Sequence, residues 1–159
     1  MAKAQSYDRD SLATMISKLL AAWCLLALTV TIHASGLSAM LRRMPASLSP
    51  AETRFWPVTR RLITVAWGLV LLHLAEIAVW ALFYLWQQCL PDAESSFYFS
   101  GVTYTTLGYG DLVLPREWRL LGPVEGLVGI LMCGLSTGFF FGVVSKFLGP
   151  KSASNRTDP

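Results

Sequence analysis

The sequence predicts an all-α membrane protein, because long apolar stretches dominate a chain that carries few charges. Hydrophobic residues make up 53% of the 159 residues and charged residues only 14%, and the mean hydropathy is +0.48. Three stretches reach or exceed the roughly 20 residues that a helix needs to cross the hydrocarbon of a bilayer. They run from about Leu19 to Leu41, from Leu62 to Trp86 and from about Leu120 to Leu148. This composition favours a helical protein with three membrane spans.

The first stretch, residues 19–41, follows an N-terminal segment of residues 1–18 and leaves three roles open. Small residues near its end, among them Ser35 and Gly36, are compatible with a secretory signal. A helix that lies along the membrane surface is the second role. We favour the third, an additional transmembrane helix that packs around the two later spans and faces lipid.

A shorter helix is predicted between the second and third spans, over residues 94–105. Asp92 or Ser95 can cap its start, and acidic residues favour the N-terminal end of a helix. The segment is too short to cross the hydrocarbon but long enough for a re-entrant helix. The C-terminal end of such a helix directs partial negative charge toward the residues that follow.

The residues that follow this helix, Thr105 to Asp111, read Thr-Thr-Leu-Gly-Tyr-Gly-Asp. Aiming successive backbone carbonyls to one side forces part of the chain into conformations that disfavour a Cβ, and Gly108 and Gly110 tolerate them. Such a strand could offer carbonyl oxygens in place of the hydration water of a cation. The same residues also suit a tight turn in a soluble protein, but the membrane composition argues against that interpretation.

This run closely resembles the selectivity filter of potassium channels, with Leu107 where valine is commonest. The resemblance is strong over about 15 residues, and it points to the small, prokaryotic-type channels whose pore domain has two spans. It implies K⁺ as the transported ion, with Asp111 at the outer mouth and Tyr109 pointing outward to brace the filter. The implied ligands of K⁺ are the hydroxyl of Thr106 and the carbonyls of Thr106, Leu107, Gly108 and Tyr109, and Gly110 completes the filter.

The resemblance further implies a pore domain over residues 62–148 and a closed homotetramer, because one copy supplies one filter strand. Within that domain we expect an outer helix at 62–88, a pore helix at 94–105, the filter at 106–110 and an inner helix at 119–148. The first span is an addition to this two-span plan. Residues 149–159 are predicted to be a disordered tail.

The expected function, by the same resemblance, is passive and potassium-selective conduction through the tetramer. Two alternatives remain open: a poorly selective cation channel, and a non-conducting regulatory membrane subunit. The sequence offers no nucleophile–base pair, metal-ligand cluster or phosphate-cradling loop, so we expect neither an enzyme nor a cofactor. The expected partners are further copies of the chain and the lipid bilayer. A net charge of +3 is explained by an arginine-rich loop and needs no nucleic acid.

Basic residues gather between the first and second spans, in residues 42–61. Five arginines stand there against Glu52 alone: Arg42, Arg43, Arg54, Arg60 and Arg61. Loops rich in Lys and Arg stay in the cytoplasm, so this loop is predicted inside and the filter mouth outside. The prediction is a multi-pass protein of the plasma membrane, with its N-terminus outside and its C-terminus in the cytoplasm.

Glycines of the third span recur every four residues, at Gly122 and Gly126 and again at Gly134, Gly138 and Gly142. This spacing puts each group on one helix face and favours close helix packing in lipid. Gly134 resembles the hinge glycine of such channels and is preferred over Gly129, because glycine weakens a helix locally. Ser136 and Thr137 either line a water-filled cavity below the filter or bond back to their own helix.

Three ionisable residues lie inside the predicted second and third spans, where the cost of a charge in lipid implies a function or a partner. His73 and Glu76 are three residues apart, on one helix face, and can bond to each other or to the pore helix. Glu125 lies near the outer end of the third span, where it can hold the pore helix in place. Proton sensing is the alternative for all three.

The surroundings of the filter depart from the family in two places. Val102 replaces a glutamate that in some relatives pairs with the acid after the filter, so Asp111 is expected to lack that partner. Phe99, in the pair Tyr98-Phe99, cannot donate a hydrogen bond, unlike the tryptophans of many relatives. We therefore predict a loosely braced filter that collapses more readily at low potassium.

Overall fold

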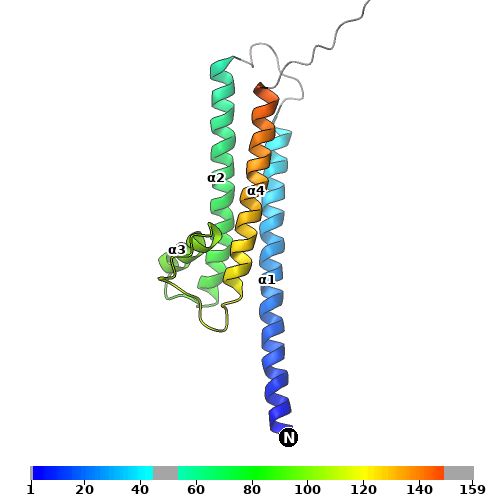
Figure 1. Cartoon of the computed structure of the whole chain (residues 1–159), viewed down its shortest axis with the longest axis vertical. Helices are drawn as coiled ribbons and strands as arrows, with labels where there is room; N and C mark the ends of the chain where they lie inside the picture. The colour runs from blue at the N-terminus through cyan, green and yellow to red at the C-terminus, as the bar shows by residue number, and fades with distance from the viewer. Residues whose placement is uncertain (1, 45–53, 149–159) are drawn as a thin grey trace, which may run out of the picture.

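The structure, a computed structural model, contains three long helices side by side and one short helix against one end of them (Figure 1). It describes the backbone of residues 2–44 and 54–148, and the side chains of Leu12 and of residues 15–44 and 54–148. The helices are α1 (Ala2–Arg42), α2 (Phe55–Trp86), α3 (Ala93–Tyr104) and α4 (Leu121–Leu148). Three segments are long and apolar enough to span a membrane: Met15–Arg42, Phe55–Trp86 and Leu121–Phe147. The prediction of an all-helical chain with three candidate spans is confirmed.

The helices extend further than hydropathy predicted. α1 covers nearly all of the segment 1–18 that was set apart from the first span, and α2 begins at Phe55, inside the predicted loop 42–61. Polar and charged residues can continue a helix beyond the hydrocarbon, so hydropathy marks the apolar part of a helix and not its ends. α2 ends at Trp86 and α4 begins at Leu121, each two residues short of the expected bounds. The predicted tail 149–159 lies outside the described residues.

The start of α3 is fixed by Asp92. Its Oδ1 accepts a hydrogen bond of 2.7 Å from the backbone N–H of Ser95, and its Oδ2 accepts one of 3.1 Å from the Ser95 hydroxyl. Glu94 adds a negative charge in the first turn, where the helix dipole favours it. Of the two candidates for the cap, Asp92 is therefore the cap and Ser95 its donor.

α1 packs along α2 and α4 through a buried stripe of four residues, Ala22, Leu25, Thr29 and His33. The spacing of three and four residues puts this stripe on one helix face. Within it, Trp80 of α2 donates a hydrogen bond of 3.0 Å from Nε1 to Thr29 Oγ1. α1 therefore lies against both of the other candidate spans, as expected for an additional helix that packs around them.

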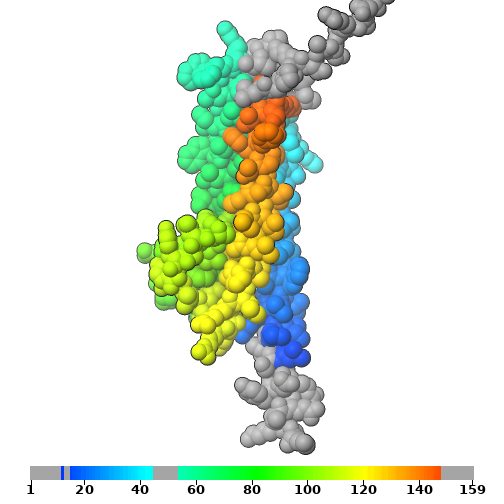
Figure 2. All heavy atoms as spheres, in the orientation of Figure 1, coloured from blue at the N-terminus to red at the C-terminus, as the bar shows by residue number. Residues whose placement is uncertain are grey.

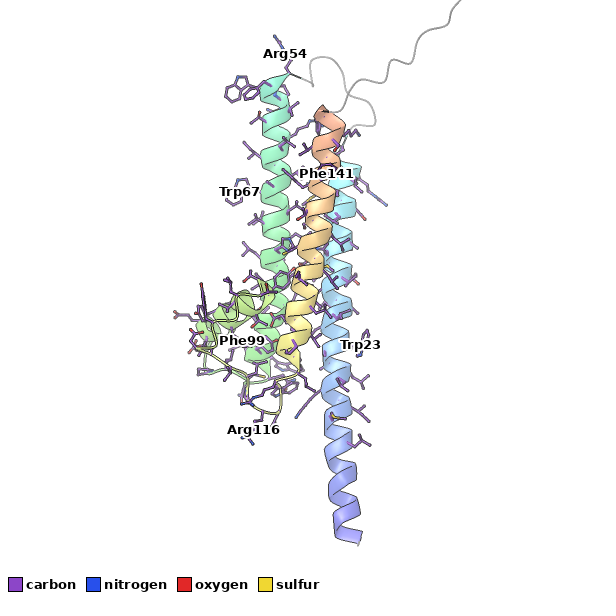
Figure 3. All side chains as sticks on the ribbon, in the orientation of Figure 1. Trp23, Arg54, Trp67, Phe99, Arg116 and Phe141 are labelled. Atoms are coloured by element: carbon purple, nitrogen blue, oxygen red, sulfur yellow. The ribbon has the colours of Figure 1, made fainter. Side chains whose placement is uncertain are left out.

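Apolar side chains cover the outside of the bundle. Trp23 of α1 and Trp67 of α2 project away from it, and their side chains are 66% and 63% exposed (Figure 3). In a lipid environment such a surface carries no hydrophobic penalty, which agrees with the spans that the composition predicts. The buried core lies where α2, α3 and α4 meet, around Trp80, Tyr84 and Tyr104.

Candidate ion pathway and the buried network behind it

The residues that join α3 to α4 carry the unusual backbone of this molecule. Thr106, Gly108 and Gly110 have φ angles of +61°, +59° and +79°, whereas Leu107 and Tyr109 between them have no positive φ. Alternation of left-handed and ordinary residues turns successive peptide units the same way, so N–H groups gather on one side and carbonyls on the other. The conformations predicted for both glycines are confirmed. We call residues 105–111 the glycine segment.

Thr106 shares the left-handed conformation although it is β-branched, which the sequence analysis did not predict. Such a residue at positive φ is strained and persists only where the surroundings hold it. Its N–H donates to Thr103 O at 2.9 Å, and the N–H of Leu107 donates to Val102 O at 2.9 Å. Both acceptors are carbonyls of the last turn of α3, which have no partner within the helix. The end of α3 thus holds the start of the glycine segment.

All residues of the glycine segment are exposed in the single chain, with Leu107 at 60% and Tyr109 at 68%. α3 and the residues that follow it protrude from the side of the bundle opposite α1 (Figure 2). One chain therefore offers carbonyl oxygens from one direction only. A cation that loses its water in this segment would need oxygens from further copies.

Asp111 has a partner that the sequence analysis did not find. Tyr98 of α3 donates a hydrogen bond of 2.8 Å from its hydroxyl to Asp111 Oδ2. This hydrogen bond raises the pKa of Tyr98, so the phenol stays a donor at neutral pH. Tyr98 lies one turn before Val102, where the sequence analysis expected Asp111 to lack a partner, and it supplies a donor to that acid. Phe99 turns the other way and packs edge-on against Tyr84, with ring centroids 5.3 Å apart.

Glu125 is buried where three helices meet. Its Oε2 accepts a hydrogen bond of 2.7 Å from the hydroxyl of Tyr84, in α2, and its Oε1 one of 2.5 Å from the hydroxyl of Ser100, in α3. Its side chain is fully buried. A carboxylate of α4 thus fastens α3 against α2, which is the contact expected for this residue.

A second buried carboxylate, Glu76 of α2, is reached from three directions. His33 Nδ1 of α1 lies 2.8 Å from Oε1, and His73 Nδ1 lies 3.3 Å from Oε2. The hydroxyl of Tyr104, at the end of α3, donates to Oε2, and it lies 2.9 Å from His73 Nδ1. The contacts expected from His73 and Glu76, to each other and to the short helix, are both present.

The sequence analysis missed His33, although it lies inside the predicted first span. It is buried, with 1% of its side chain exposed, and its Nε2 lies 3.4 Å from Ser136 Oγ of α4. The rule that intramembrane ionisable residues have partners, which selected His73 and Glu76, applies to His33 as well. The separation of 43 residues between His33 and Glu76 gave no local pattern to detect.

The glycines of α4 divide into two groups. A Cβ on Gly129 would lie 1.9 Å from the carbonyl oxygen of Tyr104, and one on Gly126 would lie 3.5 Å from that of Thr103. α4 therefore crosses the end of α3 at Gly129, where no side chain fits. A Cβ on Gly134, the hinge candidate, meets nothing within 4 Å, so the single chain does not require glycine there.

The two cavity candidates lie on different faces of α4. Ser136 is buried against α1, beside His33, and so does not border an open space in the single chain. Thr137 is exposed and donates a hydrogen bond of 2.8 Å to the carbonyl of Cys133, in the turn before it. Thr137 thus bonds back to its own helix, which is one of the two roles considered for it.

The described residues thus combine three helices that are long and apolar enough to span a membrane, a short capped helix and an exposed glycine segment. Residues 70–146 match the model of a family described as ion channel. The match includes α3, the glycine segment and most of α4, and it leaves α1 outside. The comparisons with curated proteins and with solved structures found no match. The family match and the three apolar helices suggest a membrane protein of the ion-channel type.

Proposed function

We propose that this chain is the subunit of a potassium-selective ion channel, which conducts K⁺ passively through a tetrameric pore. The observation that carries the proposal is the positive φ at Thr106, Gly108 and Gly110, every second residue of an exposed loop. That pattern lines up carbonyl oxygens, which are the ligands that replace the hydration shell of K⁺. The family match supports an ion channel as the class.

In this proposal the glycine segments of four chains surround one axis, and residues 106–110 form the selectivity filter. The hydroxyl of Thr106 and the carbonyls of Thr106, Leu107, Gly108 and Tyr109 bind K⁺ as the transported ion. α3 is the pore helix, whose C-terminal end directs partial negative charge toward the ion. Asp111, held by Tyr98, stands at the outer mouth. No cofactor and no catalytic residue take part.

The proposed orientation places the filter mouth outside the cell and the C-terminus in the cytoplasm. Arg42 and Arg54 lie at the end of the bundle away from α3, where the chain passes from α1 to α2 (Figure 1). Arg60 and Arg61 lie in the first turns of α2, at the same end. Basic residues of short connections stay in the cytoplasm, so the N-terminus lies outside in a plasma membrane.

The test is ion flux from proteoliposomes that contain the purified chain, measured separately for K⁺ and for Na⁺. Gly108→Ala places a Cβ at a φ of +59°, and we expect it to abolish K⁺ flux. Gly122→Ala is the matched control, because its added methyl meets only Phe99, at 4.0 Å, in an ordinary helix. K⁺ flux in the unmodified chain and in the control supports the proposal.

Two other results would replace this function with an alternative. Equal flux of Na⁺ and K⁺ would make the protein a poorly selective cation channel. No flux from an assembled and correctly inserted protein would make it a non-conducting regulatory subunit. Only the second result would give the glycine segment a role other than conduction.

A further inference from the structure

Both histidines of the sequence converge on one carboxylate inside the bundle. His33 comes from α1, and His73 and Glu76 come from α2. His33 and Glu76 are buried, with 1% and 0% of their side chains exposed, and His73 is 20% exposed. The proposed conduction of K⁺ by the glycine segment requires neither histidine. The contacts of both histidines with Glu76 therefore suggest a separate role.

The three side chains lie close enough to share one ion. One ligand atom from each lies within 4.8 Å of the other two. Metal–nitrogen and metal–oxygen bonds of about 2.0–2.1 Å put neighbouring ligand atoms of a tetrahedral Zn²⁺ site about 3.3–3.4 Å apart. His73 Nδ1 lies 3.3 Å from Glu76 Oε2, which is this distance, and His33 Nδ1 lies 2.8 Å from the other carboxylate oxygen, Oε1. To bind both histidines and Glu76, one ion therefore needs the carboxylate to bind through both oxygens or to turn toward one of them.

The chemistry of the three donors selects the kind of ion. Two imidazole nitrogens and one carboxylate oxygen suit Zn²⁺ and neighbouring divalent transition metals. The hard cations Mg²⁺ and Ca²⁺ take oxygen ligands instead, so this site differs in kind from a ring of carbonyls. The sequence analysis did not find this group of donors, because His33 lies 43 residues from Glu76, on another helix.

The residues around His33, His73 and Glu76 also suit metal binding. Ligating histidines usually bond through their second nitrogen to an outer partner that fixes the ring, and His33 Nε2 lies 3.4 Å from Ser136 Oγ. The hydroxyl of Tyr104 donates to Glu76 Oε2, so the carboxylate is held from the side of α3 as well. His73 is the one partly exposed member of the three, with 20% of its side chain exposed in the single chain.

We propose that His33, His73 and Glu76 form a divalent transition-metal site that takes Zn²⁺ and joins α1 to α2. The bound ion links the additional helix to the helix that carries the pore unit, at the level where α3 ends. The proposal does not depend on ion conduction, and it stands or falls on metal binding alone.

The test is Co²⁺ binding to the full chain, purified in detergent without an affinity tag and followed by visible absorption. Co²⁺ replaces Zn²⁺ in tetrahedral sites and gives a band that reports the ligands. A variant with Cys24, Cys89 and Cys133 changed to Ala serves as the background, so that only nitrogen and oxygen ligands remain. We expect one Co²⁺ per chain, displaced by Zn²⁺ and not by Mg²⁺.

His33→Gln and His73→Gln are each expected to weaken binding by more than the roughly 10–100-fold loss that follows removal of an outer partner. Glu117→Gln is the matched control, because this carboxylate is 74% exposed and lies outside the cluster, and binding should be unchanged. Zn²⁺ should also raise the apparent Tm of the unmodified chain, since an ion that binds only the folded protein stabilises it.

The two readouts keep the proposal open to refutation if one variant does not fold. In that case the Zn²⁺-dependent rise in Tm and its absence in the other histidine variant decide the matter. The proposal is overturned if the unmodified chain binds no Co²⁺, or if binding persists in a folded histidine variant. If the unmodified chain conducts no K⁺ but binds Co²⁺, the proposed channel function is contradicted and the proposed metal site is retained.

Discussion

At the scale of single residues, the backbone at the end of α3 requires glycine for two reasons: left-handed conformations and close contact with α4. The glycine segment needs left-handed residues, and Gly108 and Gly110 meet that need without strain. Tyr104, directly before the segment, needs space for its carbonyl, and Gly129 of α4 provides it. The strained Thr106 is held between these two points by hydrogen bonds to α3.

The first prediction concerns Gly129. Gly129→Ala would place a Cβ 1.9 Å from Tyr104 O, a contact that forces α4 away from α3. Overpacking of this kind costs about 1–3 kcal/mol, so the apparent Tm of the assembled protein in detergent should fall. Gly134→Ala is the control, since its Cβ meets nothing within 4 Å. Equal Tm values for both variants would show that the crossing of α3 and α4 is not close.

The second prediction concerns the hydrogen bond between Tyr98 and Asp111. Tyr98→Phe removes the donor and leaves Asp111 without it, so the proposed filter should lose K⁺ current more readily when external K⁺ is lowered. Tyr98→Trp keeps an N–H donor on an aromatic ring and should retain more of the current. The measurement is steady current over a series of external K⁺ concentrations. Identical curves for Tyr98→Phe and the unmodified chain would assign no stabilising role to this bond.

At the scale of elements, the sequence predicted which segments are helices better than where they end. Hydropathy located three spans and the capping residue Asp92 located α3, because both signals are local. α1 extends to Ala2 through a segment that is largely polar and charged, which hydropathy cannot mark as part of a helix. The packing of α1 was also hidden, since its buried stripe includes Thr29 and His33, and the partners of both lie on α2.

The third prediction tests how α1 is held. Thr29→Val keeps the shape of the side chain but leaves Trp80 Nε1 without its acceptor, at a cost of about 1–2 kcal/mol. We expect a lower apparent Tm than for the unmodified chain. Thr31→Val is the matched control, because Thr31 is exposed and bonds only to Ala27 O in its own helix. A larger loss of Tm in the control would contradict the packing of α1 described above.

At the scale of the whole molecule, the proposed ion pathway requires more than one copy of the chain. Residues 105–111 are exposed, and the glycine face of Gly134, Gly138 and Gly142 meets no neighbour within 4 Å. A four-fold assembly would bring both surfaces to a common axis, as the resemblance to potassium channels implies. The sequence motif predicted the conformation of the glycine segment, because glycines encode it locally. The sequence did not predict the link between His33 and Glu76, because it depends on how α1 and α2 pack.

The fourth prediction follows from this requirement. The protein purified in mild detergent should have the mass of four copies of the 17.5-kDa chain, once bound detergent is subtracted. Light scattering with refractive-index and absorbance detection measures this mass directly. A monomer or dimer as the largest species in lipid nanodiscs as well as in detergent would contradict the four-fold pore.

The length of α1 affects how closely large molecules can approach the proposed pore from outside. α1 has 41 residues, which at 1.5 Å per residue is about 60 Å, roughly twice the thickness of the hydrocarbon. Its candidate span begins only at Met15, and the preceding turns extend beyond the other helices at the end of the bundle where α3 lies (Figure 1). In the proposed tetramer, four such helices would extend beyond the outer entrance of the pore. There they would hinder the approach of a molecule as large as a folded protein more than the approach of a hydrated ion.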